Sequence, residues 1–196
     1  MGSAENEDVL IEKALIGLGL NNGIRYLDIG ASHPSICSNT RYFYDKGFSG
    51  VLVEPLLWNI ELIKAERPRD VLVEGVVCPD DRPFVEFRII GGHGGGSTIR
   101  DCVIPDSKKH IHPTPYRINN ILRMYFPDKP PSFMSMDIEG WELRVLQDMY
   151  FDAYPIPVVC IEHERHPEGA IDTFMFGKGY KIVAKTRSNT IYATCQ

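Results

Sequence analysis

The chain alternates between short apolar runs and longer segments whose apolar residues recur every three or four positions. Two of the apolar runs, residues 24–29 and 51–53, stop at Gly30 and Glu54, as buried strands do when a turn follows. The segment 9–18 shows the spacing of an amphipathic helix. This alternation predicts an α/β protein with a doubly wound, mostly parallel sheet that helices cover on both faces.

The same pattern predicts the individual elements. The expected strands are 24–29, 51–53, 71–77, 133–136 and 158–161. The expected helices are 9–18, 35–46, one from residue 56 that ends before Pro68, 116–126, one that Gly140 opens, and 170–176. Near the end of the chain, residues 180–184 and 190–194 flank a turn and predict a C-terminal antiparallel hairpin.

A single domain over 1–196 accounts for this pattern, because the length suits one hydrophobic core. We expect it to include an N-terminal helical segment at 1–23 and a β and loop insertion at 84–114. Within the insertion, residues 84–90 alternate apolar and polar side chains as a strand does. The glycine-rich segment 91–96 is expected to form a loop.

Composition narrows the range of partners and compartments. The net charge is −5 and the isoelectric point about 5.7, so nucleic acid, which needs a basic footprint, is not an expected partner. No apolar run approaches the ~20 residues that span a bilayer, and the acidic start lacks a secretory signal, so no membrane partner is expected. Five cysteines without a Cys-x-x-Cys pair favour reduced thiols. The sequence therefore predicts a cytoplasmic protein.

The strongest chemical signal lies at the end of the first expected strand, at Asp28 and Gly30. Glycine there either makes a tight turn only or lets the backbone approach a ligand, since ligands of open α/β sheets bind at the carboxyl ends of strands. Only one glycine of a Gly-x-Gly-x-x-Gly fingerprint is present, which favours a nucleoside ligand without a pyrophosphate. Glu54 is the expected acceptor for ribose hydroxyls. Gly75 and Val76 are expected beside the adenine.

Longer motifs make the sequence resemble the FkbM family of methyltransferases. The matching stretches are 28–34, 38–40, 44–55, 135–146 with its Asp-Ile-Glu-Gly-Trp-Glu run, and 161–163. The resemblance covers about residues 26–193. It implies a class I, Rossmann-like methyltransferase fold, in which a terminal hairpin completes the parallel sheet.

The resemblance also implies S-adenosyl-L-methionine as the cofactor and O-methylation of a hydroxyl on a small-molecule or glycan acceptor. By the resemblance, Asp28, Gly30, Ser32 and Glu54 belong to the cofactor site. With their neighbours, the expected cofactor-binding residues are Asp28, Gly30, Ala31, Ser32, Ser38, Glu54, Pro55, Gly75 and Val76.

Acidic and histidine residues follow the fourth and fifth expected strands, whose ends would meet over the transferred methyl group. We expect Asp137, Glu139 and His163 to take part in catalysis. Two chemistries stay open. His163 would act as general base, since its ordinary pKa lies near neutrality, or Asp137, Glu162 and His163 would hold a Mg²⁺ ion that acidifies a bound hydroxyl. Alternatively, Glu139 and Glu142 have a structural role only, because they lie in the first turn of the helix at Gly140, where negative charge stabilises a helix.

Two rival functions also stay open. A nicotinamide-dependent oxidoreductase would use a related fold, although the missing glycines and the expected hairpin disfavour it. A catalytically silent module that binds the cofactor is disfavoured by Asp137 and His163. A homo-oligomer is compatible with the sequence. The resemblance also indicates that the chain is shorter than many relatives, so the elements that cover the substrate are either absent or supplied by a partner subunit.

Overall fold

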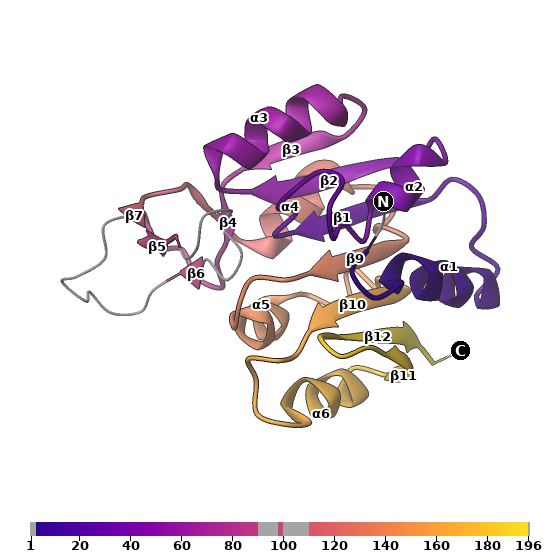
Figure 1. Cartoon of the computed structure of the whole chain (residues 1–196). Coiled ribbons are helices and arrows are strands. Elements are labelled where there is room, and N and C mark those ends of the chain that lie inside the picture. Colours follow the sequence, from indigo (N-terminus) through magenta and orange to yellow (C-terminus); the bar gives the residue numbers. More distant parts are fainter. Residues whose placement is uncertain (1–2, 90–97, 100–109, 196) are drawn as a thin grey trace.

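The computed structural model describes residues 3–89, 98–99 and 110–195, and its centre is a seven-stranded sheet (Figure 1). In spatial order the strands are β11 (Tyr180–Lys185), β12 (Asn189–Thr194), β10 (Val158–Glu162), β9 (Phe133–Met136), β1 (Arg25–Ile29), β2 (Ser49–Glu54) and β3 (Val71–Glu74). Neighbouring strands are parallel except for β12, which is antiparallel to both β10 and β11. The expected doubly wound sheet with a C-terminal hairpin is confirmed.

Helices cover both faces of the sheet. They are α1 (Glu7–Gly17), α2 (Arg41–Asp45), α3 (Leu57–Glu66), α4 (Ile118–Tyr125), α5 (Glu142–Asp148) and α6 (Ala170–Gly177). Along β1, Tyr26 packs in the cluster that contains apolar side chains of α1, α2 and α3, whereas Leu27 and Ile29 pack in the one that contains those of α4, α5 and α6. Successive residues of a strand point to opposite faces, and both faces are buried, so β1 carries apolar side chains on each of them.

Two elements differ from the sequence-based expectation. The expected strand 71–77 breaks at Gly75, after which the backbone N–H of Val76 donates to the carbonyl oxygen of Thr114 at 3.0 Å. Glycine permits this approach, since a Cβ at position 75 would lie 2.3 Å from the same oxygen. Beyond the break, β4 (Val76–Val77) leaves the main sheet and pairs with β8 (Pro115–Tyr116). The helix expected over 35–46 begins only at Arg41, since Cys37 has a left-handed φ of 55° that interrupts a helix.

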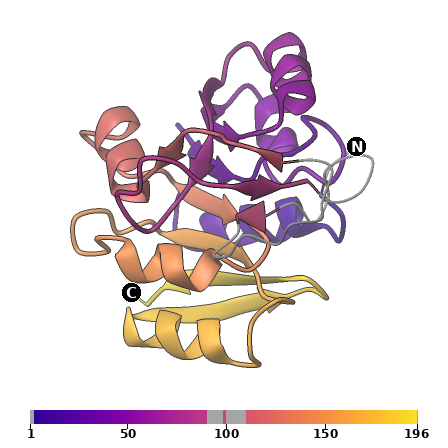
Figure 2. The ribbon, with the colours of Figure 1, turned by 90° about the vertical axis from the view of Figure 1, so that its left-hand side faces the viewer.

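The insertion forms a small antiparallel sheet of β6 (Thr98–Ile99), β5 (Phe87–Arg88) and β7 (His110–Ile111). Figure 1 shows this sheet beyond the arrowheads of β1, β2 and β9, and Figure 2 looks onto that side of the molecule. Phe87 joins a buried cluster with Val76 and Trp141, so the insertion packs against the carboxyl ends of the main strands. The segment 91–96, expected to be a loop, lies outside the described residues. In the described part of the chain, no helix has both the length and the apolar character to cross a bilayer.

Candidate active site

A pocket opens at the carboxyl ends of β1, β2 and β9, the edge where open parallel sheets bind ligands. Its wall comes from the turns that follow these strands, from α3 and from the insertion. The lining residues are Asp28, Ile29, Gly30, Ala31, Ser32, Ile36, Cys37, Ser38, Asn39, Val53, Glu54, Pro55, Leu56, Asn59, Gly75, Val76, Val77, Phe87, Ser135, Asp137, Ile138 and Glu139. The nine residues that the sequence assigns to a cofactor are all among them.

Gly30 allows the turn after β1 to press against the end of β9. Its φ is +82°, and a Cβ on it would lie 1.9 Å from the carbonyl oxygen of Asp137. Any side chain would therefore push these two segments apart. The following residue, Ala31, donates its backbone N–H to the carbonyl oxygen of Val53 at 3.1 Å, which ties the turn to the end of β2.

Glu54 is a buried carboxylate at the end of β2 and has only 3% of its surface exposed. Its Oε2 accepts a hydrogen bond from the backbone N–H of Ser32 at 2.8 Å. Its Oε1 accepts two, from the backbone N–H of Leu56 at 3.0 Å and from Nδ2 of Asn59 at 3.2 Å. Burial raises the pKa of Glu54, and these donors oppose that rise. Since each carboxylate oxygen has two lone pairs, Oε2 can accept one more donor.

Asn59 is a pocket residue that the sequence analysis did not identify. It is polar on a helix face that otherwise carries apolar residues, Leu56, Ile60 and Ile63. That exception to the helical pattern is the signal that could have identified it.

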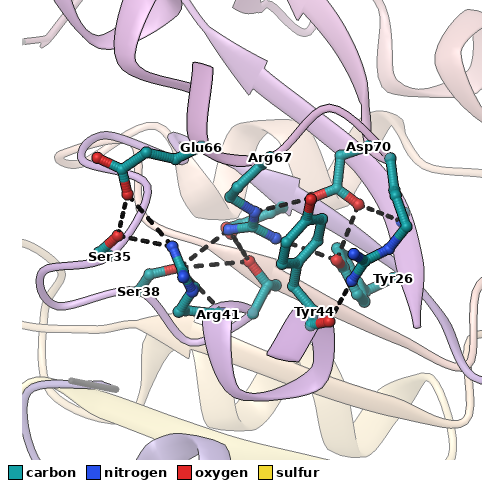
Figure 3. Close-up of polar contacts among 12 residues, drawn as sticks. Tyr26, Ser35, Ser38, Arg41, Tyr44, Glu66, Arg67 and Asp70 are labelled. Carbon is teal, nitrogen blue, oxygen red and sulfur yellow. Dashed lines mark hydrogen bonds and ion pairs between the residues drawn. The ribbon is translucent and has the colours of Figure 1, made fainter. Parts of the chain in front are cut away.

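Asp28 is also buried, and its Oδ2 accepts a hydrogen bond from the hydroxyl of Thr40 at 2.6 Å. Behind Thr40 lies the guanidinium of Arg67, which donates through Nη1 to Thr40 Oγ1 at 2.9 Å and to Ser38 Oγ at 3.3 Å (Figure 3). Burial raises the pKa of Asp28, and the Thr40 hydrogen bond and the positive charge of Arg67 counter it. Arg67 therefore supports two pocket residues at once.

The other nitrogen atoms of the Arg67 guanidinium donate hydrogen bonds to side chains of the core. Nε donates to Asp70 Oδ2 at 2.8 Å, and the side chains of this ion pair are fully buried. Nη2 donates to the hydroxyl of Tyr26 at 3.1 Å, and the guanidinium lies over the ring of Tyr44 (Figure 3). In the sequence, Arg67 stands directly before Pro68, and this position predicts only that a helix ends there. Its role becomes visible only when these partners are brought together.

Acidic side chains gather where β9 ends. Asp137 faces the open pocket and is reached by solvent there, although many protein atoms surround it. Burial, with the nearby charges of Glu139 and Glu142, raises the pKa of Asp137 to about 7. Glu139 has a left-handed φ of 60° and forms an ion pair with Nε of Arg165. Both expected acceptor-side carboxylates therefore lie on the pocket wall.

Glu142, the first residue of α5, is fully buried and well satisfied. Its Oε1 accepts the backbone N–H of Ile138 at 2.7 Å. Its Oε2 accepts the backbone N–H of Gly140 at 2.9 Å and lies 2.6 Å from Nε2 of His166. The carboxylate thus holds the turn between β9 and α5. This agrees with the structural role expected of a negative charge at a helix N-terminus.

Glu162 lies at the end of β10, beside this acidic group. One carboxylate oxygen each from Asp137, Glu142 and Glu162 lie within 4.8 Å of one another. Burial and the charge of Asp137 raise the pKa of Glu162 to about 8. His163 stands apart, because its Nδ1 lies 3.1 Å from Thr190 Oγ1 and it lines a separate depression. The structure therefore places Glu142, and not His163, with the two expected metal-binding carboxylates.

Comparisons with known proteins agree with this geometry. The sequence matches the methyltransferase FkbM domain over residues 28–182. The crystal structure of a methyltransferase FkbM from Methylobacillus flagellatus KT is similar with a TM-score of 0.53 and 15% identity, over 89% of this chain and 45% of that chain. This chain thus spans less than half of that structure. A TehB-like SAM-dependent methyltransferase from Corynebacterium glutamicum ATCC 13032 Kitasato gives a TM-score of 0.50 at 10% identity, over 98% and 89% of the two chains. No curated protein matches.

At such identities the structural likeness shows the fold, and both structures have the class I methyltransferase fold expected from the sequence. The domain match covers most of the chain, including the strand ends that line the pocket. The chain belongs to the FkbM family of methyltransferases.

Proposed function

We propose that the protein transfers a methyl group from S-adenosyl-L-methionine to a hydroxyl oxygen of a small molecule or glycan. The observation that carries the proposal is Glu54, a buried carboxylate at the end of β2 with acceptor capacity left on Oε2. A buried acid in this position fits a ribose hydroxyl, which donates a hydrogen bond and carries no charge.

The pocket suits this cofactor in other respects. Gly30 and Gly75 let backbone segments of the pocket wall pack directly against each other, which fixes the shape of the wall. In the proposed site Gly75 and Val76 lie beside the adenine. Ser38, on the pocket wall, accepts a hydrogen bond from the guanidinium of Arg67. The pocket offers Glu54 and Asp28 to a ligand, which favours a nucleoside over a diphosphate-containing dinucleotide.

The bound cofactor would supply an electrophilic methyl group, and the chain's own residues would align the acceptor. Asp137 and Glu139 are assigned to the acceptor side, because they line the same pocket from the end of β9. A carboxylate oxygen of one of them would accept the hydroxyl proton as the new carbon–oxygen bond forms and the methyl–sulfur bond of the cofactor breaks. In-line attack needs close alignment of the two reacting atoms, which the rigid strand ends would provide. His163 does not line this pocket, and its expected role as general base stays a prediction.

Calorimetry with the purified protein tests the cofactor. We expect S-adenosylmethionine and S-adenosylhomocysteine to bind and NAD not to bind. Glu54→Gln should weaken S-adenosylmethionine binding by about tenfold or more, the effect of losing a hydrogen bond to a charged group. Glu61→Gln, the same change at an exposed position of α3, is the matched control and should bind as the parent does.

Three results would contradict the proposal. Tight binding of NAD without S-adenosylmethionine would favour the oxidoreductase. Cofactor binding without turnover on any of a broad panel of hydroxylated acceptors would favour the silent module. Equal affinity of the Glu54→Gln and Glu61→Gln variants would remove the ribose role of Glu54.

A further inference from the structure

The carboxylates at the ends of β9 and β10 are spaced as the ligands of one ion would be. One oxygen each from Asp137, Glu142 and Glu162 lie within 4.8 Å of one another. Two oxygens that bind an ion at 2.0–2.6 Å stand at most roughly 4–5 Å apart, on opposite sides of it. The spacing therefore suits a cation of calcium's size after at most a small inward movement of the side chains, and magnesium or manganese after a larger one.

Glu162 supplies an independent reason to place a cation here. The residue is 7% exposed, and among the described residues its Oε2 is the buried side-chain oxygen or nitrogen that lacks a hydrogen-bond partner. A buried acceptor without a donor costs free energy, and more when it is charged. Three carboxylates at this spacing also repel one another when they are ionised. A bound cation would satisfy the oxygen and relieve the repulsion together.

The basic side chains Arg165 and His166 near this cluster have other hydrogen-bond partners. Arg165 forms an ion pair with Glu139 through Nε. His166 contacts Oε2 of Glu142 through Nε2 at 2.6 Å. Neither contact reaches Oε2 of Glu162, which stays without a hydrogen-bond partner.

We propose that Asp137, Glu142 and Glu162 form a binding site for a hard divalent cation at the edge of the methyl-transfer pocket. A ligand set made only of carboxylate oxygens selects magnesium, manganese or calcium over softer metals. Asp137 faces the open pocket, so water or an acceptor oxygen can complete the coordination there. The ion's role in lowering the pKa of an acceptor hydroxyl rests on the proposed function, whereas its binding does not.

The test is a titration with manganese alone, followed by the paramagnetic resonance signal of the free ion. It uses the whole chain without S-adenosylmethionine, so failure of the proposed function leaves the result unaffected. We expect one ion to bind with a dissociation constant in the millimolar range or below. Glu162→Gln should weaken binding at least about tenfold, whereas Glu164→Gln, an exposed glutamate two residues further on, should leave it unchanged.

Thermal unfolding separates loss of the site from loss of the fold. In the presence of EDTA, Glu162→Gln should unfold at the same temperature as the parent or higher, because the amide carries no charge that repels Asp137 and can donate a hydrogen bond to a neighbouring carboxylate. Saturating manganese should raise the unfolding temperature of the parent and not that of Glu162→Gln. The proposal is overturned if the parent binds no manganese, or if Glu162→Gln binds it as the parent does.

Discussion

Arg67 offers the sharpest test of how the pocket is held, because its contacts join pocket residues to the core. We predict that Arg67→Met destabilises the protein strongly although position 67 does not line the pocket. The substitution keeps an apolar side chain that can pack against Tyr26 and Tyr44 while it removes the charge. It therefore isolates the polar network from the packing.

The magnitude follows from the burial of the Arg67–Asp70 pair, whose side chains are both 0% exposed. Removing one partner of a buried ion pair costs about 3–5 kcal/mol, because the other charge is left uncompensated. Asp70 would keep hydrogen bonds from the Tyr26 hydroxyl and the Gly50 backbone N–H, which limits the cost. We therefore expect the free energy of unfolding to fall by about 3–5 kcal/mol, or the unfolding temperature by about 6–20 °C.

Urea unfolding, followed by circular dichroism and tryptophan fluorescence, measures the loss. The matched control is Arg41→Met, since Arg41 lies in the same region but pairs with Asp45 and Glu66, whose side chains are 55% and 38% exposed (Figure 3). Exposed pairs contribute at most about 1 kcal/mol. Asp70→Asn, added to Arg67→Met, should recover part of the lost stability because it removes the uncompensated charge. A loss at Arg67 no greater than that at Arg41 would refute this reasoning.

Three further predictions concern single contacts. Gly30→Ala should abolish detectable S-adenosylmethionine binding in calorimetry, since its Cβ would lie 1.9 Å from the carbonyl oxygen of Asp137; unchanged affinity would contradict the close approach. Asn59→Ala removes a donor from the buried Glu54 and should lower the free energy of unfolding by about 1–3 kcal/mol in urea titrations, and no change would mean that water replaces the amide. Tyr180→Phe removes a 2.7 Å hydrogen bond to a buried backbone carbonyl and should cost about 1–3 kcal/mol by the same measurement; a neutral result would show that the carbonyl finds another donor.

The strand ends of this protein could be predicted from the sequence, and with them much of the pocket. An apolar run that stops at Glu54 or just before Gly30 marks the end of a buried strand. Parallel strands end at the same edge of a sheet, so residues far apart in sequence can be placed side by side without coordinates. Asp28 and Glu54 were found in this way.

Contacts between side chains without a periodic pattern could not be predicted. Arg67 bonds to Thr40 and Tyr26, which lie 27 and 41 residues away, and nothing in the sequence joins them. The grouping of Glu142 with Glu162 likewise depends on how a turn and a strand end are oriented. The break at Gly75 could not be predicted, because it depends on a hydrogen bond between the backbone of Val76 and that of Thr114, which is distant in the sequence.

The order of strands has a consequence for how the chain can fold as it is made. β12 comes last in the sequence, yet it lies between β10 and β11 and pairs with both. Until residues 189–194 have left the ribosome, β10 has an edge of unpaired N–H and C=O groups, and such an edge attracts other strands. This half of the sheet can therefore close only after β12 has been made, and a chain that lacks those six residues should aggregate rather than form a smaller stable sheet.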